Sequence, residues 1–365
     1  ITVHLTTEYT KTDGFVGSFT SRLEGPKGEF GIRHGVTIVA TGSEEYRGPE
    51  YGYGSDPRII TQQDFEAFLS DGSRESEIED LRSIVMIQCI GPAERYCSRI
   101  CCTTALKNAL MLKRHNPETQ ITVIYRDIRT YGFRERIYEE ARRAGVMFVQ
   151  YDFDDKPEVR VDGSRLQVAV YESVLARELT LEPDLVVLSM PVVPSEGAME
   201  LATRLKTPVD LDGFFLEAHV KLRPVDFATE GFFLAGMAHY PKFLGESIAQ
   251  AQAAAARAVT ILSRDTLEVG GVVAQVDEEV CVGCLTCLRI CPYDVPQIRA
   301  ELTGVGEIKG AAYIEPAQCH GCGICVGECP AKAIQLLHYR DTQMEAKVAA
   351  LMEPVPVPAL WSDGR

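Results

Sequence analysis

Two copies of one cysteine pattern constrain this 365-residue sequence more than any other feature. The first copy, CVGCLTCLRICP, runs from Cys281 to Pro292, and the second, CHGCGICVGECP, runs from Cys319 to Pro330. Each copy spaces its cysteines as C-x2-C-x2-C-x3-C and then places a proline. A fold that contains this segment has to gather eight thiols, which in a long chain favours metal or redox chemistry over a disulfide framework.

The spacing is the one that bacterial ferredoxins use for two 4Fe-4S clusters. Three closely spaced thiolates wrap a loop around one cubane, and the fourth reaches the other cubane. We therefore expect one cluster on Cys281, Cys284, Cys287 and Cys329, and a second on Cys319, Cys322, Cys325 and Cys291. Zinc is the alternative, but a zinc site needs only four ligands and does not require this pattern twice. Two adjacent clusters would pass one electron at a time.

Upstream of the repeat, alternating apolar segments predict an α/β domain with a parallel sheet. The expected elements are, in order, a strand at 83–89, a helix at 98–115, a strand at 121–127, a helix at 133–145 and a strand at 146–151. A hairpin at 157–172 with an Asp162-Gly163 turn and a buried strand at 184–190 are expected to follow. Ligands of such folds lie beyond the carboxyl ends of the strands.

The remaining cysteines cluster at one such strand end. Cys89 ends the first expected strand, and Cys97, Cys101 and Cys102 lie at the start of the following helix. The connecting turn, CIGPAERYC, has no G-x-G-x-x-G, so we do not expect NAD(P)H here. A third 4Fe-4S cluster would fit if the first helical turn is irregular, because adjacent residues of an ideal helix diverge by about 100°. Buried free thiols and a dithiol redox pair are the alternatives.

This third group carries a resemblance to a known family. The pattern of a cysteine after a strand followed by YCSR-x-CC and AL resembles the HdrA family, the flavin and iron-sulfur subunits of heterodisulfide reductase in methanogens and many other anaerobes. The matching residues are Cys89, Tyr96, Cys97, Ser98, Arg99, Cys101, Cys102, Ala105 and Leu106. The resemblance implies an additional 4Fe-4S cluster on the four cysteines, although the gap from Cys89 to Cys97 is shorter than the family pattern.

Two further stretches match the same family and imply a flavin. In GVTIVATGSEEYRGPEYGYG (35–54) a strand ends in an Ala-Thr-Gly turn, and in GFFLAGMAHYPKFLGESIAQAQAAAARAV (231–259) a strand, a glycine and a Pro-Lys pair precede a small-residue helix expected to begin near Glu246. The expected FAD contacts are Ala40, Thr41, Gly42, Gly236, Lys242, Glu246 and Ser247. Lys242 would meet the isoalloxazine or a phosphate, with a solvent lysine as the alternative. The free amides of the helix end would suit a phosphate or a flavin carbonyl.

The fold class that these features predict is α/β: an incomplete, thioredoxin-reductase-like flavoprotein with two dinucleotide-binding domains, followed by an α+β ferredoxin domain with two 4Fe-4S clusters. No G-x-G-x-x-G occurs in the chain, and its first residue is Ile1. We therefore expect an amino-terminal flavoprotein part to be missing, so that the FAD site is incomplete in this chain. The segment ITVHLTT is expected to start in a strand, with antiparallel strands turning at Asp13-Gly14 and Gly25-Pro26.

The expected domain boundaries follow from these assignments. They are a first part of the FAD domain at 1–79, the nucleotide-fold unit with a cluster at 80–210, a return to the FAD domain at 211–264, the ferredoxin domain at 276–338 and a tail at 339–365. The proline-rich tail holds the only tryptophan, Trp361, and is expected to be a flexible end or to lie along a partner protein.

Composition excludes several functional classes. The formal charge is −15, with 52 acidic and 37 basic residues and no basic stripe, so we do not expect nucleic-acid binding. No apolar run reaches the roughly 18 residues of a membrane-spanning helix. The clustered cysteines favour the reducing cytoplasm. We identify no catalytic residues, because no Ser/His/Asp arrangement, His-rich site or P-loop is present, and we expect His239 and His320 to be structural or surface residues.

Three functional hypotheses remain open. The first is an electron-transfer component of a cytoplasmic oxidoreductase, with flavin-based electron bifurcation as the family resemblance implies. Its partners would be iron-sulfur and disulfide-reducing subunits, subunits linked to hydrogenase or formate dehydrogenase, and ferredoxin. The second is a relay without bifurcation in a quinone-linked or aromatic acyl-CoA reductase complex. The third is a non-catalytic, ferredoxin-like docking scaffold.

Overall fold

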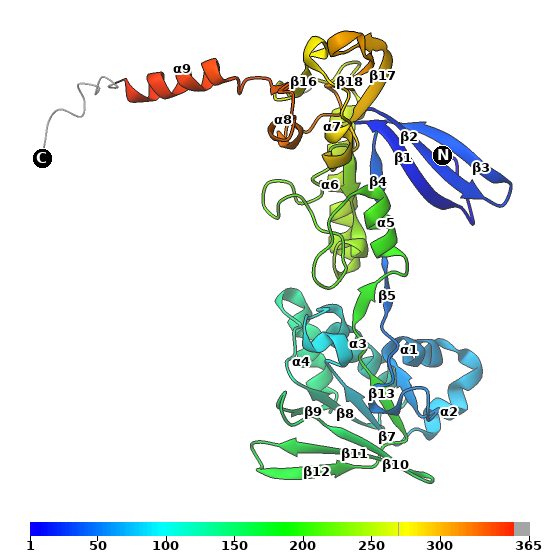
Figure 1. The fold of residues 1–365 in the computed structure, drawn as a ribbon. Coiled ribbons are helices and arrows are strands. Elements are labelled where there is room, and N and C mark those ends of the chain that lie inside the picture. Colours follow the sequence, from blue (N-terminus) through cyan, green and yellow to red (C-terminus); the bar gives the residue numbers. More distant parts are fainter. Residues whose placement is uncertain (269, 354–365) are drawn as a thin grey trace, which may run out of the picture. The chain divides into compact units, whose positions relative to one another are not determined.

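A computed structural model describes residues 1–268 and 270–353 of the chain (Figure 1). Trp361 and the proline-rich segment of the tail lie outside these described residues. The chain divides into two compact units, one formed by Ile1–Val36 together with Val259–Arg365 and the other by Thr37–Ala258. The finer domain boundaries expected from the sequence stay predictions.

The larger unit is organised around a five-stranded parallel sheet with the strand order β6-β13-β7-β8-β9. Its strands are β6 (Ile59–Thr61), β7 (Ser83–Ile87), β8 (Gln120–Tyr125), β9 (Met147–Gln150) and β13 (Leu185–Leu188). The predicted α/β class is confirmed by this sheet. Strand β6 was not foreseen, because a three-residue strand is too short to produce a periodic apolar pattern.

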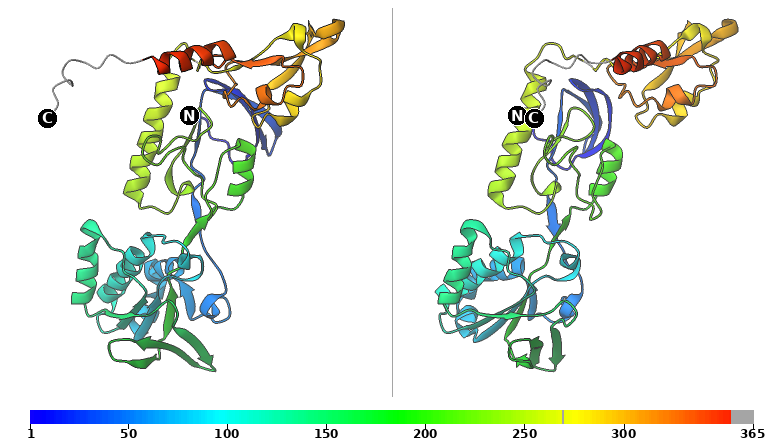
Figure 2. Two further views of the ribbon diagram at one scale, coloured as in Figure 1. Left: turned by 60° about the vertical axis from the view of Figure 1, so that its left-hand side comes forward. Right: turned by 90° about the vertical axis from the view of Figure 1, so that its left-hand side faces the viewer.

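Side chains of the parallel sheet alternate between two apolar layers, as strand geometry requires. On β7, Ile84 and Met86 face one core cluster, and Val85 and Ile87 face the other. The first cluster is covered by helices α1 (Gln62–Ser70), α2 (Glu75–Asp80), α3 (Ile100–His115) and α4 (Glu135–Arg143). The second is covered by the antiparallel strands β10 (Glu158–Asp162), β11 (Arg165–Glu172) and β12 (Arg177–Leu181). Figure 2 shows these strands on the face opposite the helices.

The hairpin between β10 and β11 has the predicted turn. Asp162 pairs with Arg165, so only Gly163 and Ser164 form the loop, and Gly163 has a φ of +57°. A two-residue loop with a positive φ matches the right-handed twist of the strands. The buried side chains of β11, such as Val168, then face the parallel sheet.

The rest of the larger unit consists of short paired strands and two helices. Strand β4 (Thr37–Val39) pairs in parallel with β15 (Phe232–Leu234), and β5 (Ser43–Glu45) pairs antiparallel with β14 (Val192–Pro194). Helices α5 (Ala198–Leu205) and α6 (Leu244–Leu262) follow β14 and β15. Helix α6 begins two residues before the expected Glu246, because the Glu246 carboxylate accepts a hydrogen bond from the amide of Phe243 and so caps the helix.

The amino-terminal strands form an antiparallel sheet of β1 (Glu8–Phe15), β2 (Ser18–Gly25) and β3 (Gly28–His34). The expected strand at residues 1–7 is wrong, since β1 begins at Glu8. The expected Asp13-Gly14 turn is also wrong: Asp13 pairs with Thr20, and the chain turns at residues 16–17. This register places Phe19 on the buried side of β2, which is the stronger constraint on strand pairing. The Gly25-Pro26 turn is confirmed.

The ferredoxin-like region has two short antiparallel ribbons and two short helices, one from each cysteine motif. The ribbons are β16 (Ala274–Val276) with β19 (Ile334–Leu336), and β17 (Pro296–Thr303) with β18 (Lys309–Ile314); the helices are α7 (Thr286–Ile290) and α8 (Ile324–Gly327). The third cysteine of each motif, Cys287 or Cys325, lies on its helix. Helix α9 (Asp341–Met352) follows this region.

Candidate iron-sulfur and cofactor sites

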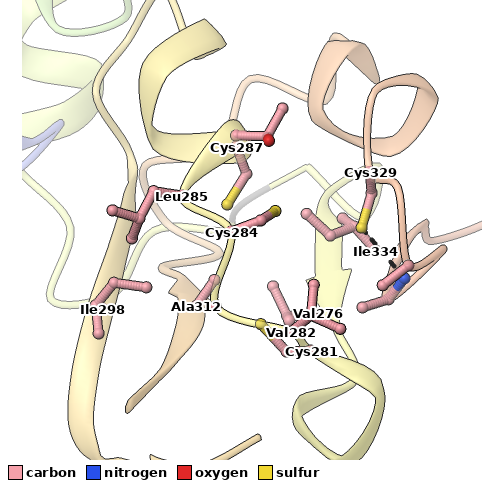
Figure 3. A pocket seen from close by; sticks show the side chains of 14 residues that line it. Val276, Cys281, Val282, Cys284, Leu285, Cys287, Ile298, Ala312, Cys329 and Ile334 are labelled. Atoms are coloured by element: carbon pink, nitrogen blue, oxygen red, sulfur yellow. Dashed lines mark hydrogen bonds between the residues drawn. The ribbon is translucent and has the colours of Figure 1, made fainter. Parts of the chain in front are cut away.

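Cysteines from both motif copies line one pocket. Its sulfur-bearing residues are Cys281, Cys284 and Cys287 from the first copy and Cys329 from the second. Figure 3 shows these side chains around a common space, whose other walls are mostly aliphatic. The structure thus brings together the four residues that the sequence assigns to one cluster, with the fourth contributed across the repeat.

A cubane and a single ion differ in how far apart their thiolate ligands stand. Thiolates at about 2.3 Å from one tetrahedral zinc ion would place their sulfurs about 3.8 Å apart. In a 4Fe-4S cluster each thiolate binds a different iron, so the sulfurs stand farther apart. Within residues 1–268 and 270–353, no three His, Cys, Asp or Glu side chains form a group suited to a single metal ion. Four thiols around one mostly aliphatic pocket match the ligand set that the sequence predicts for a cluster.

Backbone amides donate to two sulfurs of the second motif copy, one from each predicted ligand set. The amide of Ala333 lies 3.3 Å from Cys329 Sγ, as the dashed line in Figure 3 shows. The amides of Ala274 and Gly321 lie 3.3 and 3.4 Å from Cys319 Sγ. Such bonds stabilise negative charge on cluster sulfurs and raise the reduction potential.

The second predicted ligand set is also close together. The pKa of Cys325 is raised to about 11, first by burial and then by the neighbouring thiols of Cys319, Cys291 and Cys322, in that order. Cys291 comes from the first motif copy, so this group too combines both copies. Cys287 of the other group also acts on Cys325, which means that the two groups adjoin. The ring of His320 stacks on Tyr293 beside these motifs, with ring centroids 3.8 Å apart.

The third cysteine group lies at the carboxyl edge of the parallel sheet. The chain proceeds from β7 through β8 to β9 on one side, and β13 then joins the other side of β7. Strand order therefore reverses beside β7, and ligands of open α/β sheets bind at such a switch point. Cys89 follows β7 here, and its pKa is raised to about 11 by burial and then by the thiols of Cys102 and Cys97.

Two adjacent cysteines lie in the first turn of α3, directly after a left-handed residue that precedes the helix. Arg99 precedes the helix with a φ of +62°, and Cys101 and Cys102 lie buried in the first turn. A hydrogen bond between these two thiols raises the pKa of Cys101 and lowers that of Cys102 to about 7. The thiol of Cys102 also lies 3.7 Å from the carbonyl oxygen of Asp127.

The residues between the cysteines attach this loop to the segment after β13. The Val192 amide donates to Ser98 Oγ at 3.0 Å, and the Tyr96 hydroxyl donates to the Val192 carbonyl. These contacts of Tyr96 and Ser98 hold the loop in place without using the thiols.

Two positively charged residues that sequence reasoning missed face the third group. Arg126 lowers the pKa of Cys89, and Arg129 lowers that of Cys102. Both follow β8, next to β7 in the sheet. The rule that residues after neighbouring parallel strands meet at one edge was the available signal.

The predicted flavin turns lie at the ends of two neighbouring parallel strands. Ala40, Thr41 and Gly42 follow β4, and Gly236 follows β15; the Ala235 amide donates to the Val39 carbonyl at 2.9 Å. Gly42 and Gly236 have φ values of +76° and +72°, and apart from residues adjacent along the chain no protein atom lies within 4 Å of where a Cβ would stand on either one. Both turns therefore leave open space beside their backbone.

Lys242 is buried beside these turns. Its side chain donates to the Gly236 carbonyl, and its ammonium nitrogen lies 3.8 Å from the ring centroid of Tyr240. The residue is only 4% exposed, so the solvent-lysine alternative is wrong. Burial, and then the nearby Arg99 guanidinium, lowers its pKa to about 8.

Glu246 and Ser247 occupy the first turn of α6. The Glu246 carboxylate accepts from the Phe243 amide at 2.8 Å and pairs with Arg99 at 3.1 Å, while the Ser247 amide donates to the Phe243 carbonyl. A carboxylate thus occupies the helix end where a phosphate was one alternative. Like charges repel, so this position favours an uncharged group such as a flavin carbonyl.

His239 is buried and has two side-chain partners, as expected of a structural residue. Its Nε2 lies 2.7 Å from a Glu217 carboxylate oxygen, and its Nδ1 lies 2.7 Å from the side-chain nitrogen of Gln250. Burial lowers the pKa of His239 despite the Glu217 carboxylate. Through Glu217 and Gln250, His239 links the loop before β15 to α6.

No helix in the described parts of the chain has the length and apolar character needed to cross a membrane.

The comparisons with known proteins agree with the cysteine geometry. A family described as a 4Fe-4S dicluster domain matches residues 280–333, which contain both motif copies. The HdrA protein of the H2:CoB-CoM heterodisulfide,ferredoxin reductase of Methanothermobacter marburgensis is 36% identical over 346 residues, covering 89% of this chain and 50% of that protein. In Methanopyrus kandleri, the HdrA iron-sulfur protein numbered 1 of the CoB-CoM heterodisulfide reductase is 37% identical over 348 residues. The match covers 89% of this chain and 51% of that protein.

Among solved structures, T. acidophilum thioredoxin reductase is similar with a TM-score of 0.44 and 13% identity, over 70% of this chain and 72% of that one. The HdrA protein of the ferredoxin:CoB-CoM heterodisulfide reductase of Methanosarcina acetivorans is 35% identical over 305 residues, covering 71% of this chain and 37% of that protein. Over most of its own length the chain is a homologue of the HdrA proteins of heterodisulfide reductase, and it spans about half the length of the curated relatives it matches.

Proposed function

We propose that the chain is an electron-transfer part of an oxidoreductase, in which 4Fe-4S clusters exchange electrons with FAD. The observation that carries this proposal is the cavity lined by Cys281, Cys284, Cys287 and Cys329. Thiols from two distant motif copies around one cavity match the ligand exchange of a two-cluster ferredoxin. Because the two groups adjoin through Cys287 and Cys325, the clusters would form a short electron path.

The third cysteine group would hold a third cluster. Its four thiols lie together at the switch point of the sheet, with Arg126 and Arg129 close enough to stabilise thiolates. Positive charge beside a cluster favours its reduced form, so these arginines would raise its potential. Buried free thiols would have no need of two adjacent cations.

FAD would bind at the turns after β4 and β15. Gly42 and Gly236 leave their backbone open to a ring or a ribityl chain, and Lys242 is buried beside them. A flavin, when bound, converts two-electron transfer into single-electron transfer. The lysine would hold a positive charge near the ring, and Tyr240 would fix its side chain. The chain has no G-x-G-x-x-G, so other residues would have to hold the pyrophosphate.

The finer proposal is electron bifurcation in a cytoplasmic complex. The name of the M. marburgensis relative combines H2 with two acceptors, a heterodisulfide and ferredoxin. By homology, electrons from the flavin would divide between the ferredoxin-type clusters and a disulfide-reducing subunit. Partner subunits would include iron-sulfur, disulfide-reducing and hydrogenase- or formate-dehydrogenase-linked proteins.

A pair of ligand substitutions tests the cluster assignment. Cys329→Ala should remove the cluster held mainly by the first motif copy, and Cys291→Ala should remove the one held by the second. Each variant, purified without oxygen, should lose about four irons and one paramagnetic signal after reduction with dithionite, and the two lost signals should differ. Loss of the same signal in both variants, or zinc in place of iron, would overturn the assignment.

Iron and flavin analysis separates the wider alternatives. About twelve irons, from three cubanes, and one FAD per assembly copy would support the electron-transfer proposal. Eight irons and no flavin would favour the docking scaffold. If flavin is present, a reduced flavin that supplies electrons to only one acceptor would favour the relay without bifurcation.

A further inference from the structure

Arg99 occupies a conspicuous position in the third cysteine loop. It lies between Cys97 and Cys101, and its own amide donates to Cys97 Sγ at 3.3 Å. Its φ of +62° is left-handed, a conformation that costs a non-glycine residue about 1 kcal/mol or more. Despite this cost the position carries a large, charged side chain, so the side chain is expected to have a compensating role.

The guanidinium group of Arg99 reaches the segment that contains Lys242. It donates to the Pro241 carbonyl at 3.0 Å and to both carboxylate oxygens of Glu246 at 3.1 and 3.2 Å. It also donates to the Tyr131 hydroxyl at 2.8 Å and lies 5.4 Å from the ring centroid of Tyr240. One side chain therefore connects the cysteine loop, the loop after β8 and the start of α6.

A solvent-exposed ion pair would not explain this arrangement. Exposed pairs contribute little to stability, and a lysine could supply one. The Arg99 side chain is only 25% exposed, and it uses its planar fork on a carboxylate and a carbonyl together. Arginine suits such fixed, multiple contacts, whereas lysine provides a single point charge.

We propose that Arg99 is a positioning residue that holds the third cysteine group against the Pro241–Glu246 segment and places a positive charge between the two. This inference rests on the proposed function, because it assigns a cluster to one side of Arg99 and a flavin to the other. The contacts would keep the separation of the two centres constant, and electron transfer slows steeply as such a separation grows.

The Arg99 side chain also acts electrostatically on the Pro241–Glu246 segment. Its positive charge adds to the effect of burial in lowering the pKa of Lys242. Removal of the charge should therefore be felt on both sides of Arg99, at the cysteine loop and at the lysine.

Two substitutions separate the charge from the geometry. Arg99→Lys keeps the positive charge but loses the fork, and Arg99→Gln loses both. Arg95→Gln is the matched control, because it removes an arginine from the same loop whose side chain is 70% exposed and forms a long ion pair with Asp212, at 3.9 Å. The anaerobically purified protein is examined by a redox titration of the third cluster and by hydrogen exchange of residues 240–247.

We expect Arg99→Gln to shift the midpoint potential of the third cluster to a more negative value and to speed exchange of residues 240–247 about tenfold. Arg99→Lys should speed the exchange but leave the potential near that of the wild type. Arg95→Gln should change neither quantity. If Arg99→Gln leaves both quantities unchanged while the wild type contains the third cluster and FAD, the positioning role is wrong and the proposed function stands. A wild-type protein without the third cluster or without flavin would overturn the proposed function instead.

Discussion

The two glycine turns after β4 and β15 allow a sharp test of the flavin site. Gly42→Ala adds a methyl group where, apart from residues adjacent along the chain, no protein atom lies within 4 Å, on a backbone with φ of +76°. Since nothing clashes within the chain, the cost to folding is only the left-handed strain of alanine, about 1–2 kcal/mol. A cofactor that lies against this backbone would meet the methyl group directly.

Gly54 supplies a matched control. It also has a positive φ, +83°, and open space at the position of a Cβ, but it lies outside the predicted cofactor residues. Gly54→Ala should therefore cost the same 1–2 kcal/mol in folding, approximately, and leave FAD binding unchanged. The comparison removes strain as an explanation for any loss of cofactor.

The expected loss of affinity follows from overpacking. An inserted methyl group in a fitted contact costs about 1–3 kcal/mol, which corresponds to a rise of roughly 5- to 150-fold in the dissociation constant of FAD. Gly236→Ala should behave in the same way. The assay is titration of flavin-depleted protein with FAD, followed by visible absorbance, together with chemical denaturation of each variant.

Two outcomes would refute the reasoning. If Gly42→Ala binds FAD as tightly as the wild type, the flavin does not approach the backbone at this turn. If Gly54→Ala loses as much FAD as Gly42→Ala, the loss reflects strain or unfolding and carries no information about contact with the cofactor.

Further predictions concern stability and pH. Leu106→Ala, at a fully buried site of α3, should lower the free energy of unfolding by about 2–5 kcal/mol in urea titrations; an unchanged midpoint would contradict this core assignment. Thr61→Ala removes the cap of α1 and a hydrogen bond to Glu45, and should cost about 0.5–2 kcal/mol. Lys242 has its pKa lowered from 10.5 to about 8. The folded state therefore releases this proton at a lower pH than the unfolded state. The contribution of Lys242 to the free energy of unfolding is least favourable below pH 8. It rises between pH 8 and 10.5, by at most about 3 kcal/mol. Unfolding of Lys242→Met at pH 7 and pH 10 should lack this rise; an identical pH profile would contradict the burial of the charge.

Long periodic elements of the fold were predictable from the sequence, and short ones were not. The strand in SIVMIQC and the helix that contains Leu106 follow directly from apolar pattern, and the structure has them as β7 and α3. Strand β6 escaped notice because it has three residues. The first hairpin turn was misplaced because both Gly14 and Gly17 permit a positive φ, and only the packing of Phe19 selects between the two registers.

The candidate sites divide in the same way. The grouping of cysteines could be read from spacing, since three ligands within seven residues must share a loop. Spacing could not reveal the roles of Arg126 and Arg129 or the contacts of Arg99. These depend on which segments the sheet order brings to one edge. The burial of Lys242 was equally hidden, as the letters around it are consistent with a surface loop.

By itself the sequence determined the local chemistry of this protein: where thiols are concentrated, and which segments alternate between strand and helix. These properties depend on residues a few positions apart, whose geometry the backbone restricts directly. Only the tertiary structure decided which other distant segments meet, such as Arg99 with Glu246 and Arg126 with Cys89. Such encounters depend on the packing of whole elements, because burial of apolar faces selects the strand order and register that bring polar groups far apart in the chain into contact.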